Sequence, residues 1–95
     1  MSEPAVFVLT MQAVAGPANA EPDGRTYDLL VFARGGDADE AEAVARRGLD
    51  QLGWIDAAIL RNGEITNPDG VPDDLRASFQ RALTQGCSVI VYDKP

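Results

Sequence analysis

The sequence predicts an α+β fold in which two helices cover one face of a four-stranded mixed sheet. Two amphipathic segments of helical length each end in a glycine that leads directly into an apolar strand, at Gly53 before Trp54 and at Gly86 before Cys87. Upstream of them, two stretches alternate between apolar and polar residues, which is the period of strands with one buried face. The chain has 95 residues, so we expect a single domain over residues 1–95 with elements in the order ββαβαβ.

The first two strands are predicted at residues 5–15 and 25–34, joined as an antiparallel hairpin with a turn at Pro22-Asp23-Gly24. Because Asp28 and Arg34 resist burial, the even-numbered side of the second strand is expected to point away from the helices. The odd-numbered side then faces the core, and its residues are Phe7, Leu9, Met11, Ala13, Tyr27, Leu29, Val31 and Ala33.

The first helix is predicted over residues 38–52. Asp37 is a suitable N-cap, and Glu40 can complete a capping-box pair with it. One apolar stripe runs along this helix and consists of Ala41, Val44, Ala45, Gly48, Leu49 and Leu52. A glycine within the stripe costs about 1 kcal/mol of helix propensity relative to alanine, so Gly48 indicates a close approach of helix and sheet. Gly53 is placed to end the helix in the left-handed conformation.

The second helix is predicted over residues 72–85, and the last two strands at 55–61 and 87–92. The helix carries a second apolar stripe of Leu75, Phe79, Ala82 and Leu83. Right-handed crossovers would make the last three strands parallel if they followed one another in the sheet, although interleaving is possible. Asn62-Gly63 is a strong hairpin signal, so an extra short strand after it stays open. The resulting two-layer sandwich is ferredoxin-like in shape, and that shape alone implies no function.

The composition excludes several kinds of chemistry. The chain has no histidine and one cysteine, Cys87. A histidine general base, a Ser–His or Cys–His pair, a cysteine-based metal cluster and an intrachain disulfide are therefore excluded. Cys87 begins an apolar run, so we expect a small buried side chain rather than a reactive thiol. We predict no catalytic residue, no metal site and no cofactor, and an enzyme of this composition would have to work with Asp, Glu, Arg and Tyr.

The net charge of −7 bears on the partners and on the compartment. Nucleic acids and anionic membranes both require a clustered Lys/Arg surface, so we expect neither as a partner. Seven arginines against one lysine, with fourteen alanines, indicate a GC-rich bacterial genome. The segment ending in Ala18-Asn19-Ala20 resembles a signal peptide, but it lacks a preceding positive charge and has the period of a strand. A cytoplasmic protein is therefore expected.

The candidate site is the even-numbered side of the first two strands. Without a helix over it, this side would expose a larger apolar patch than a soluble monomer usually shows, made of Val6, Val8, Leu30 and Phe32 with Ala58 and Leu60. The simplest way to cover the patch is a symmetric homodimer. The second is that the patch forms a groove occupied by an apolar ligand or another protein. Asp28 and Arg34 are expected at the rim, where each could face the other across a two-fold axis. The predicted ligand- or partner-binding residues are Leu30, Phe32, Val6, Val8, Asp28 and Arg34.

Three functions stay open at this point. The first is a small non-catalytic bacterial module that self-associates and binds a protein or a small ligand. The second is an acidic inhibitor or immunity-type protein that covers a basic partner surface, with electrostatic steering by its negative charge. The third is an enzyme without histidine, and it is the least favoured because the sequence contains no recognisable catalytic constellation.

Overall fold

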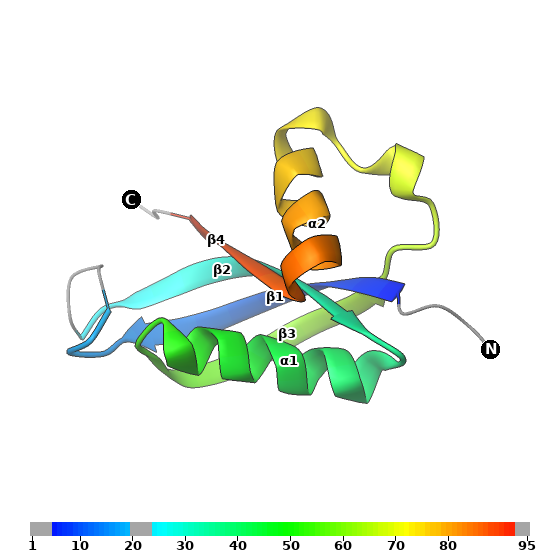
Figure 1. Ribbon diagram of the computed structural model, residues 1–95. Helices are drawn as coiled ribbons and strands as arrows, with labels where there is room; N and C mark the ends of the chain where they lie inside the picture. Colours follow the sequence, from blue (N-terminus) through cyan, green and yellow to red (C-terminus); the bar gives the residue numbers. More distant parts are fainter. Residues whose placement is uncertain (1–4, 20–23, 93–95) are drawn as a thin grey trace.

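The computed structural model describes residues 5–19 and 24–92 of the chain, and it has the predicted class and element order. The expected turn residues Pro22-Asp23, and Ala20 of the signal-peptide-like segment, lie outside the described residues. The elements are β1 (Ala5–Ala15), β2 (Thr26–Gly35), α1 (Ala38–Gln51), β3 (Trp54–Glu64), a single 3-10 turn η1 (Pro68–Gly70), α2 (Asp73–Gln85) and β4 (Cys87–Tyr92), as Figure 1 shows.

The four strands form one sheet with the order β3-β1-β2-β4. All three neighbouring pairs are antiparallel, so the prediction of a mixed sheet whose last three strands run parallel was wrong. The β1–β2 hairpin occupies the centre, and β3 and β4 are added at opposite edges. β3 also continues through Asn62-Gly63 up to Glu64, so no extra hairpin forms there.

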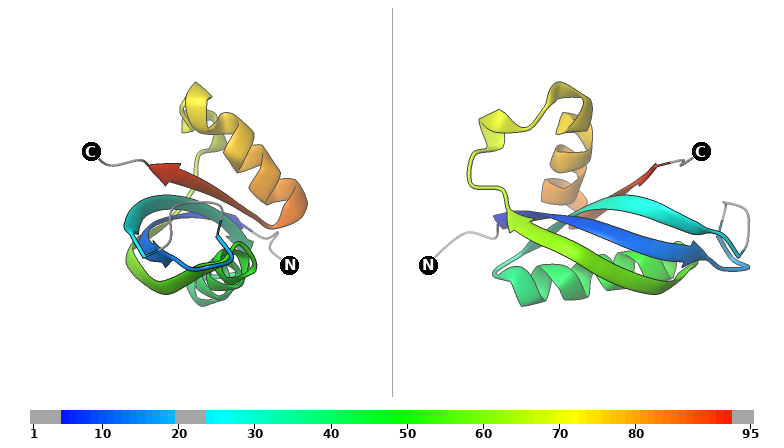
Figure 2. Two further views of the ribbon diagram at one scale, coloured as in Figure 1. Left: turned by 90° about the vertical axis from the view of Figure 1, so that its left-hand side faces the viewer. Right: turned by 180° about the vertical axis from the view of Figure 1, so that it is seen from behind.

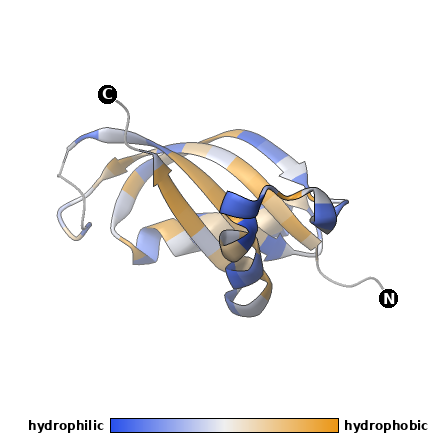
Figure 3. Cartoon of the chain, turned by 90° about the horizontal axis from the view of Figure 1, so that it is seen from above, coloured by the Kyte–Doolittle hydropathy of each residue, from blue (hydrophilic) through white to orange (hydrophobic). Residues whose placement is uncertain are grey.

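The first hydrophobic core lies between α1 and the odd-numbered side of the hairpin, as predicted. Leu9, Leu29 and Val31 are almost completely buried there against Ala45 and Leu49 of α1. Hydrophobic residues are concentrated in the strands (Figure 3), and a second cluster of them lies on the other side of the sheet. This sheet is therefore apolar on both sides and needs a cover on both.

The second hydrophobic core lies on the other side of the sheet, under α2. Phe79 and Ala82 of α2 pack there against Val6 and Phe32, and Figure 2 shows the two helices on opposite sides of the sheet. The prediction that both helices share one side was therefore wrong, and the molecule has three layers. The physical reason is that α1 already covers the odd-numbered side, while the large apolar side chains of the even-numbered side match the stripe of α2.

The ends of α1 follow the predicted chemistry. The Asp37 side chain accepts a hydrogen bond from the Glu40 N–H at 2.8 Å, and the Glu40 carboxylate accepts one from the Gly36 N–H at 2.8 Å. Gly53 has the left-handed φ of 86°, and a Cβ there would also lie 2.6 Å from the Asn19 nitrogen. Neither described helix is long and apolar enough to cross a membrane.

Candidate functional site

The even-numbered side of the hairpin is covered within the molecule, contrary to the premise of the predicted site. Val6 and Phe32 are only 3% and 2% exposed beneath α2. Val8 and Leu30 are half-buried and pack against the same core. A second copy could pack on Val6 only after α2 had moved away, so this side of the sheet does not offer the predicted dimer interface.

A strap of residues 65–72 connects β3 to α2 and runs over this side of the sheet. At its start, the Ile65 N–H donates a hydrogen bond to the Val6 carbonyl at 2.9 Å. At its end, the Arg76 guanidinium donates one to the Val71 carbonyl at 3.2 Å, and the Val71 side chain is only 7% exposed. Both ends of the strap are therefore fixed to the rest of the fold.

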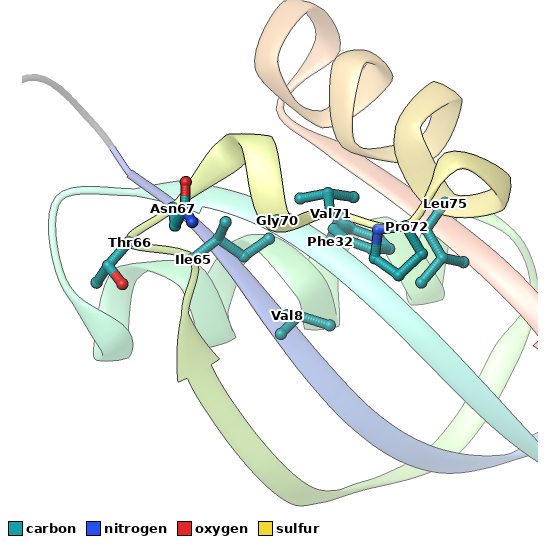
Figure 4. A pocket seen from close by; sticks show the side chains of 9 residues that line it. All are labelled: Val8, Phe32, Ile65, Thr66, Asn67, Gly70, Val71, Pro72 and Leu75. Carbon is teal, nitrogen blue, oxygen red and sulfur yellow. The ribbon is translucent and has the colours of Figure 1, made fainter.

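A pocket of about 360 Å³ lies between the strap and the sheet. Its floor is formed by Val8 of β1 and Phe32 of β2, and Figure 4 shows the strap and the start of α2 around it. The remaining lining residues are Ile65, Thr66, Asn67, Gly70, Val71, Pro72 and Leu75. None of these residues is charged, and the polar side chains among them come from Thr66 and Asn67. Such a lining favours an apolar group with at most a neutral polar end.

Arg34, one of the predicted rim residues, holds the end of α2. Its guanidinium donates a hydrogen bond to the Leu83 carbonyl, which lies in the last turn of the helix, where carbonyls generally lack intrahelical donors. A positive charge is also favourable at the C-terminal end of a helix. Gly86 ends the same helix with a left-handed φ of 97° and donates its N–H to the Ala82 carbonyl at 2.8 Å.

Asp28, the other predicted rim residue, lies far along β2 from Arg34. It accepts a hydrogen bond from the Gln12 side-chain amide at 3.0 Å. In the register of the sheet Asp28 is opposite Gln12 and Tyr92, whereas Arg34 is opposite Val6. The two residues therefore belong to different ends of the sheet and do not form one polar site within the chain.

A second pocket, of about 380 Å³, lies beside the start of β4. It is lined by Gly48, Gln51, Leu52, Arg81, Gln85, Cys87, Ser88 and Val89. Cys87 is half-buried here, and burial raises the pKa of its thiol. A raised thiol pKa leaves little thiolate at neutral pH, which agrees with a packing role rather than a nucleophilic one.

Comparison with known proteins assigns no function to this site. Searches against protein-family models, curated proteins and solved structures found no match to the chain. Within residues 5–19 and 24–92, no group of three or more His, Cys, Asp or Glu side chains could hold a metal ion.

Sequence reasoning found two of the pocket residues, Val8 and Phe32, but missed the strap that completes it. A signal was present. Ile65 and Val71 are apolar residues on either side of the polar turn Asn67-Pro68-Asp69-Gly70, and apolar residues that flank a polar loop often fold back onto the core.

Proposed function

We propose that this chain is a small non-catalytic bacterial module that binds an apolar group in the pocket beneath the strap and acts as a cytoplasmic homodimer. The proposal that the chain binds an apolar group rests on the pocket of about 360 Å³, whose lining is uncharged and mainly aliphatic. Sites for small molecules are typically concave and mostly apolar, with a few polar groups.

The lining specifies the chemistry of the ligand. A charged group would lose its hydration inside the pocket without gaining a partner of opposite charge, which is costly. An aliphatic chain, a small aromatic ring or an apolar side chain of another protein would instead remove its own surface and the exposed surface of Val8 and Leu75 from water.

The test uses the neutral fluorescent probe 1-aminoanthracene. We expect its emission to rise on binding to the wild type, and we expect the methyl NMR signals of Val8, Ile65 and Leu75 to shift. The variant Val8→Phe fills the pocket from its floor. A Cβ at the neighbouring Gly63 would meet nothing within 4 Å, so there is room beside Val8 for the larger side chain. We expect this variant to fold and to lose most of the binding.

Val14→Phe is the matched control. Val14 lies on the same side of the same strand and is half-buried, but it does not line the pocket. This variant should bind the probe like the wild type. Equal binding by the Val8→Phe variant would place the probe elsewhere and contradict the proposed site.

An acidic inhibitor is the second candidate, and the arrangement of carboxylates supports it. Gly35, which precedes α1, and Glu64, the last residue of β3, both pair with the start of β1. Six acidic residues therefore belong to the segments that begin or end at this end of the sheet, namely the N-cap and first half of α1, the end of β3 and the strap, and they are Asp37, Asp39, Glu40, Glu42, Glu64 and Asp69. A protein partner that binds at low salt and is released at high salt would favour this function over the first.

A further inference from the structure

The two edges of the sheet differ in how they are protected. β3 carries two register shifts against β1, between Thr10 and Met11 and between Gln12 and Val14, and Asp56 on it has a positive φ of 50°. It also carries three charged residues, Asp56, Arg61 and Glu64. Bulges and charges are the features by which natural sheets prevent pairing with another chain.

β4, the opposite edge, has none of these features. Its six residues, Cys87–Tyr92, include no charge, no proline and no glycine, and its register against β2 is unbroken. Val89, Ile90 and Val91 are only half-buried, and Tyr92 is 43% exposed. An apolar, regular and exposed edge of this kind is a template for a further strand.

The register shows which backbone groups of β4 are available. The Arg34 N–H donates a hydrogen bond to the Gly86 carbonyl at 2.8 Å, and in an antiparallel pair the hydrogen-bonded positions recur at every second residue. Ser88, Ile90 and Tyr92 therefore bond to β2. The residues between them, Cys87, Val89 and Val91, turn their N–H and carbonyl groups to the open side. Within the described part of the chain no strand pairs with that side.

We propose that two copies of this chain pair through β4, antiparallel, with Val89 on the two-fold axis. This register places Val89 opposite its own copy and Cys87 opposite Val91 of the second copy. In this register every outward-facing N–H and carbonyl group of β4 forms a hydrogen bond with the second copy. The two four-stranded sheets then become one continuous sheet of eight strands. A register centred on Ile90 would place Cys87 opposite position 93, which lies beyond the end of β4. The backbone N–H and carbonyl of Cys87 would then have no partner residue within the strand of the second copy.

The surroundings of β4 support a second copy as the occupant. β4 is uncharged, and the one ionisable side chain besides Cys87 in the lining of the adjoining pocket is Arg81, so among the described residues no carboxylates of the two copies meet at the axis. In the antiparallel register the far end of the partner strand lies beside Cys87. Its Val91 side chain would extend to the pocket of about 380 Å³ between the C-terminal ends of α1 and α2. This proposal deepens the self-association in the proposed function and does not involve the pocket beneath the strap.

The first test is sedimentation of the wild type and of Val89→Pro. The Val89 N–H is not used in the pairing with β2, and proline is tolerated on an edge strand where the N–H faces outward. Two intermolecular hydrogen bonds would be lost at the axis, so we expect the wild type to be a dimer at micromolar concentration and the variant to have a dissociation constant raised roughly thirtyfold or more. Probe binding in the pocket beneath the strap should persist in this variant, which separates the two proposals.

The second test traps the register and does not depend on the stability of the proline variant. In a Cys87→Ser background, Val89→Cys should form an intermolecular disulfide under mild oxidation, because directly opposed residues have suitable Cα separations. Ile90→Cys is the control, and it should remain reduced because position 90 is displaced from its copy along the strand. A wild type that stays monomeric at millimolar concentration, a dimer unaffected by Val89→Pro, or equal cross-linking at positions 89 and 90 would each overturn the proposal. So would a β4 edge that captures an extended peptide while the chain itself remains monomeric.

Discussion

The sulfur of Cys87 lies where a side chain at position 48 would have to go. A Cβ added to Gly48 would be 2.9 Å from Cys87 Sγ, closer than non-bonded atoms can approach. The contact joins α1 to the first residue of β4, and it explains why a helix accepts a glycine at this point. The close approach predicted from the sequence is therefore confirmed, and it has a measurable energetic consequence.

We expect Gly48→Ala to be destabilising in the wild-type background and stabilising once Cys87 is also replaced by alanine. In the first case, overpacking of typically 1–3 kcal/mol outweighs a gain in helix propensity of about 1 kcal/mol. In the second case the propensity gain remains and the obstruction is gone. Urea denaturation of the wild type, the two single variants and the double variant gives the coupling energy. A coupling energy near zero would contradict the contact.

The first core should depend strongly on Leu49. This side chain is 1% exposed and lies at the centre of the contact between α1 and the sheet. Leu49→Ala is expected to reduce the free energy of unfolding by about 2–5 kcal/mol. Arg47→Ala, two residues earlier on the exposed side of the helix, should change it by no more than about 0.5 kcal/mol. Similar denaturation midpoints for the two variants would show that the buried side of α1 has been assigned incorrectly.

The hydrogen bond from the Arg34 guanidinium to the Leu83 carbonyl should stabilise the C-terminal end of α2. Arg34→Ala removes a charge-assisted donor from a helix C-terminus on the surface, so we expect a loss of roughly 0.5–1.5 kcal/mol. The loss should be local. Amide hydrogen exchange at Ala82 and Gly86 should accelerate, while exchange in α1 stays unchanged. Uniform acceleration across both helices would instead indicate that Arg34 supports the whole fold.

The Cys87 thiol should make the stability of the fold depend on pH in the alkaline range. Burial raises the pKa of this thiol, so the folded chain keeps a proton that the unfolded chain has already released. The stability that depends on the protonated Cys87 thiol should therefore be fully present below the thiol pKa of the unfolded chain, about 8.5. It should be lost as the pH rises through the higher pKa of the folded state. Chemical denaturation of the wild type and Cys87→Ala between roughly pH 8 and 10 isolates this contribution. The same slope in both proteins would assign the effect to other groups.

The elements of this fold, the β1–β2 hairpin and the side covered by α1 were predictable from the sequence, whereas the position of α2 and the direction of the edge strands were not. The alternation in β1 and β2 and the stripe of α1 depend on near neighbours, and these predictions were confirmed. The side of the sheet taken by α2 depends on the pairing of strands at opposite edges. Val6 and Phe32 would appear in the same alternating pattern whether a second copy or a helix of the same chain covered them.

For the same reason the candidate site was only partly predictable. The apolar residues Val8 and Phe32 were identified because their side of the sheet required a cover. The strap was not identified, because it contributes to the pocket through two apolar residues, Ile65 and Val71, in an otherwise polar connection. Arg34 had a charge that indicated an exposed position, and the sequence contained no sign that a helix would end beside it.

The central position of the β1–β2 hairpin has a consequence for how the chain folds. The hairpin and the packing of α1 join residues that are close in sequence, whereas the pairing of β4 with β2 closes a loop containing most of the domain. Pairings between residues so far apart in sequence form slowly. Until β4 docks, the outer edge of β2 is unpaired and Phe32 is uncovered, which makes the incomplete sheet prone to aggregation. The rate at which α2 and β4 dock should therefore set the yield of folded protein at high concentration.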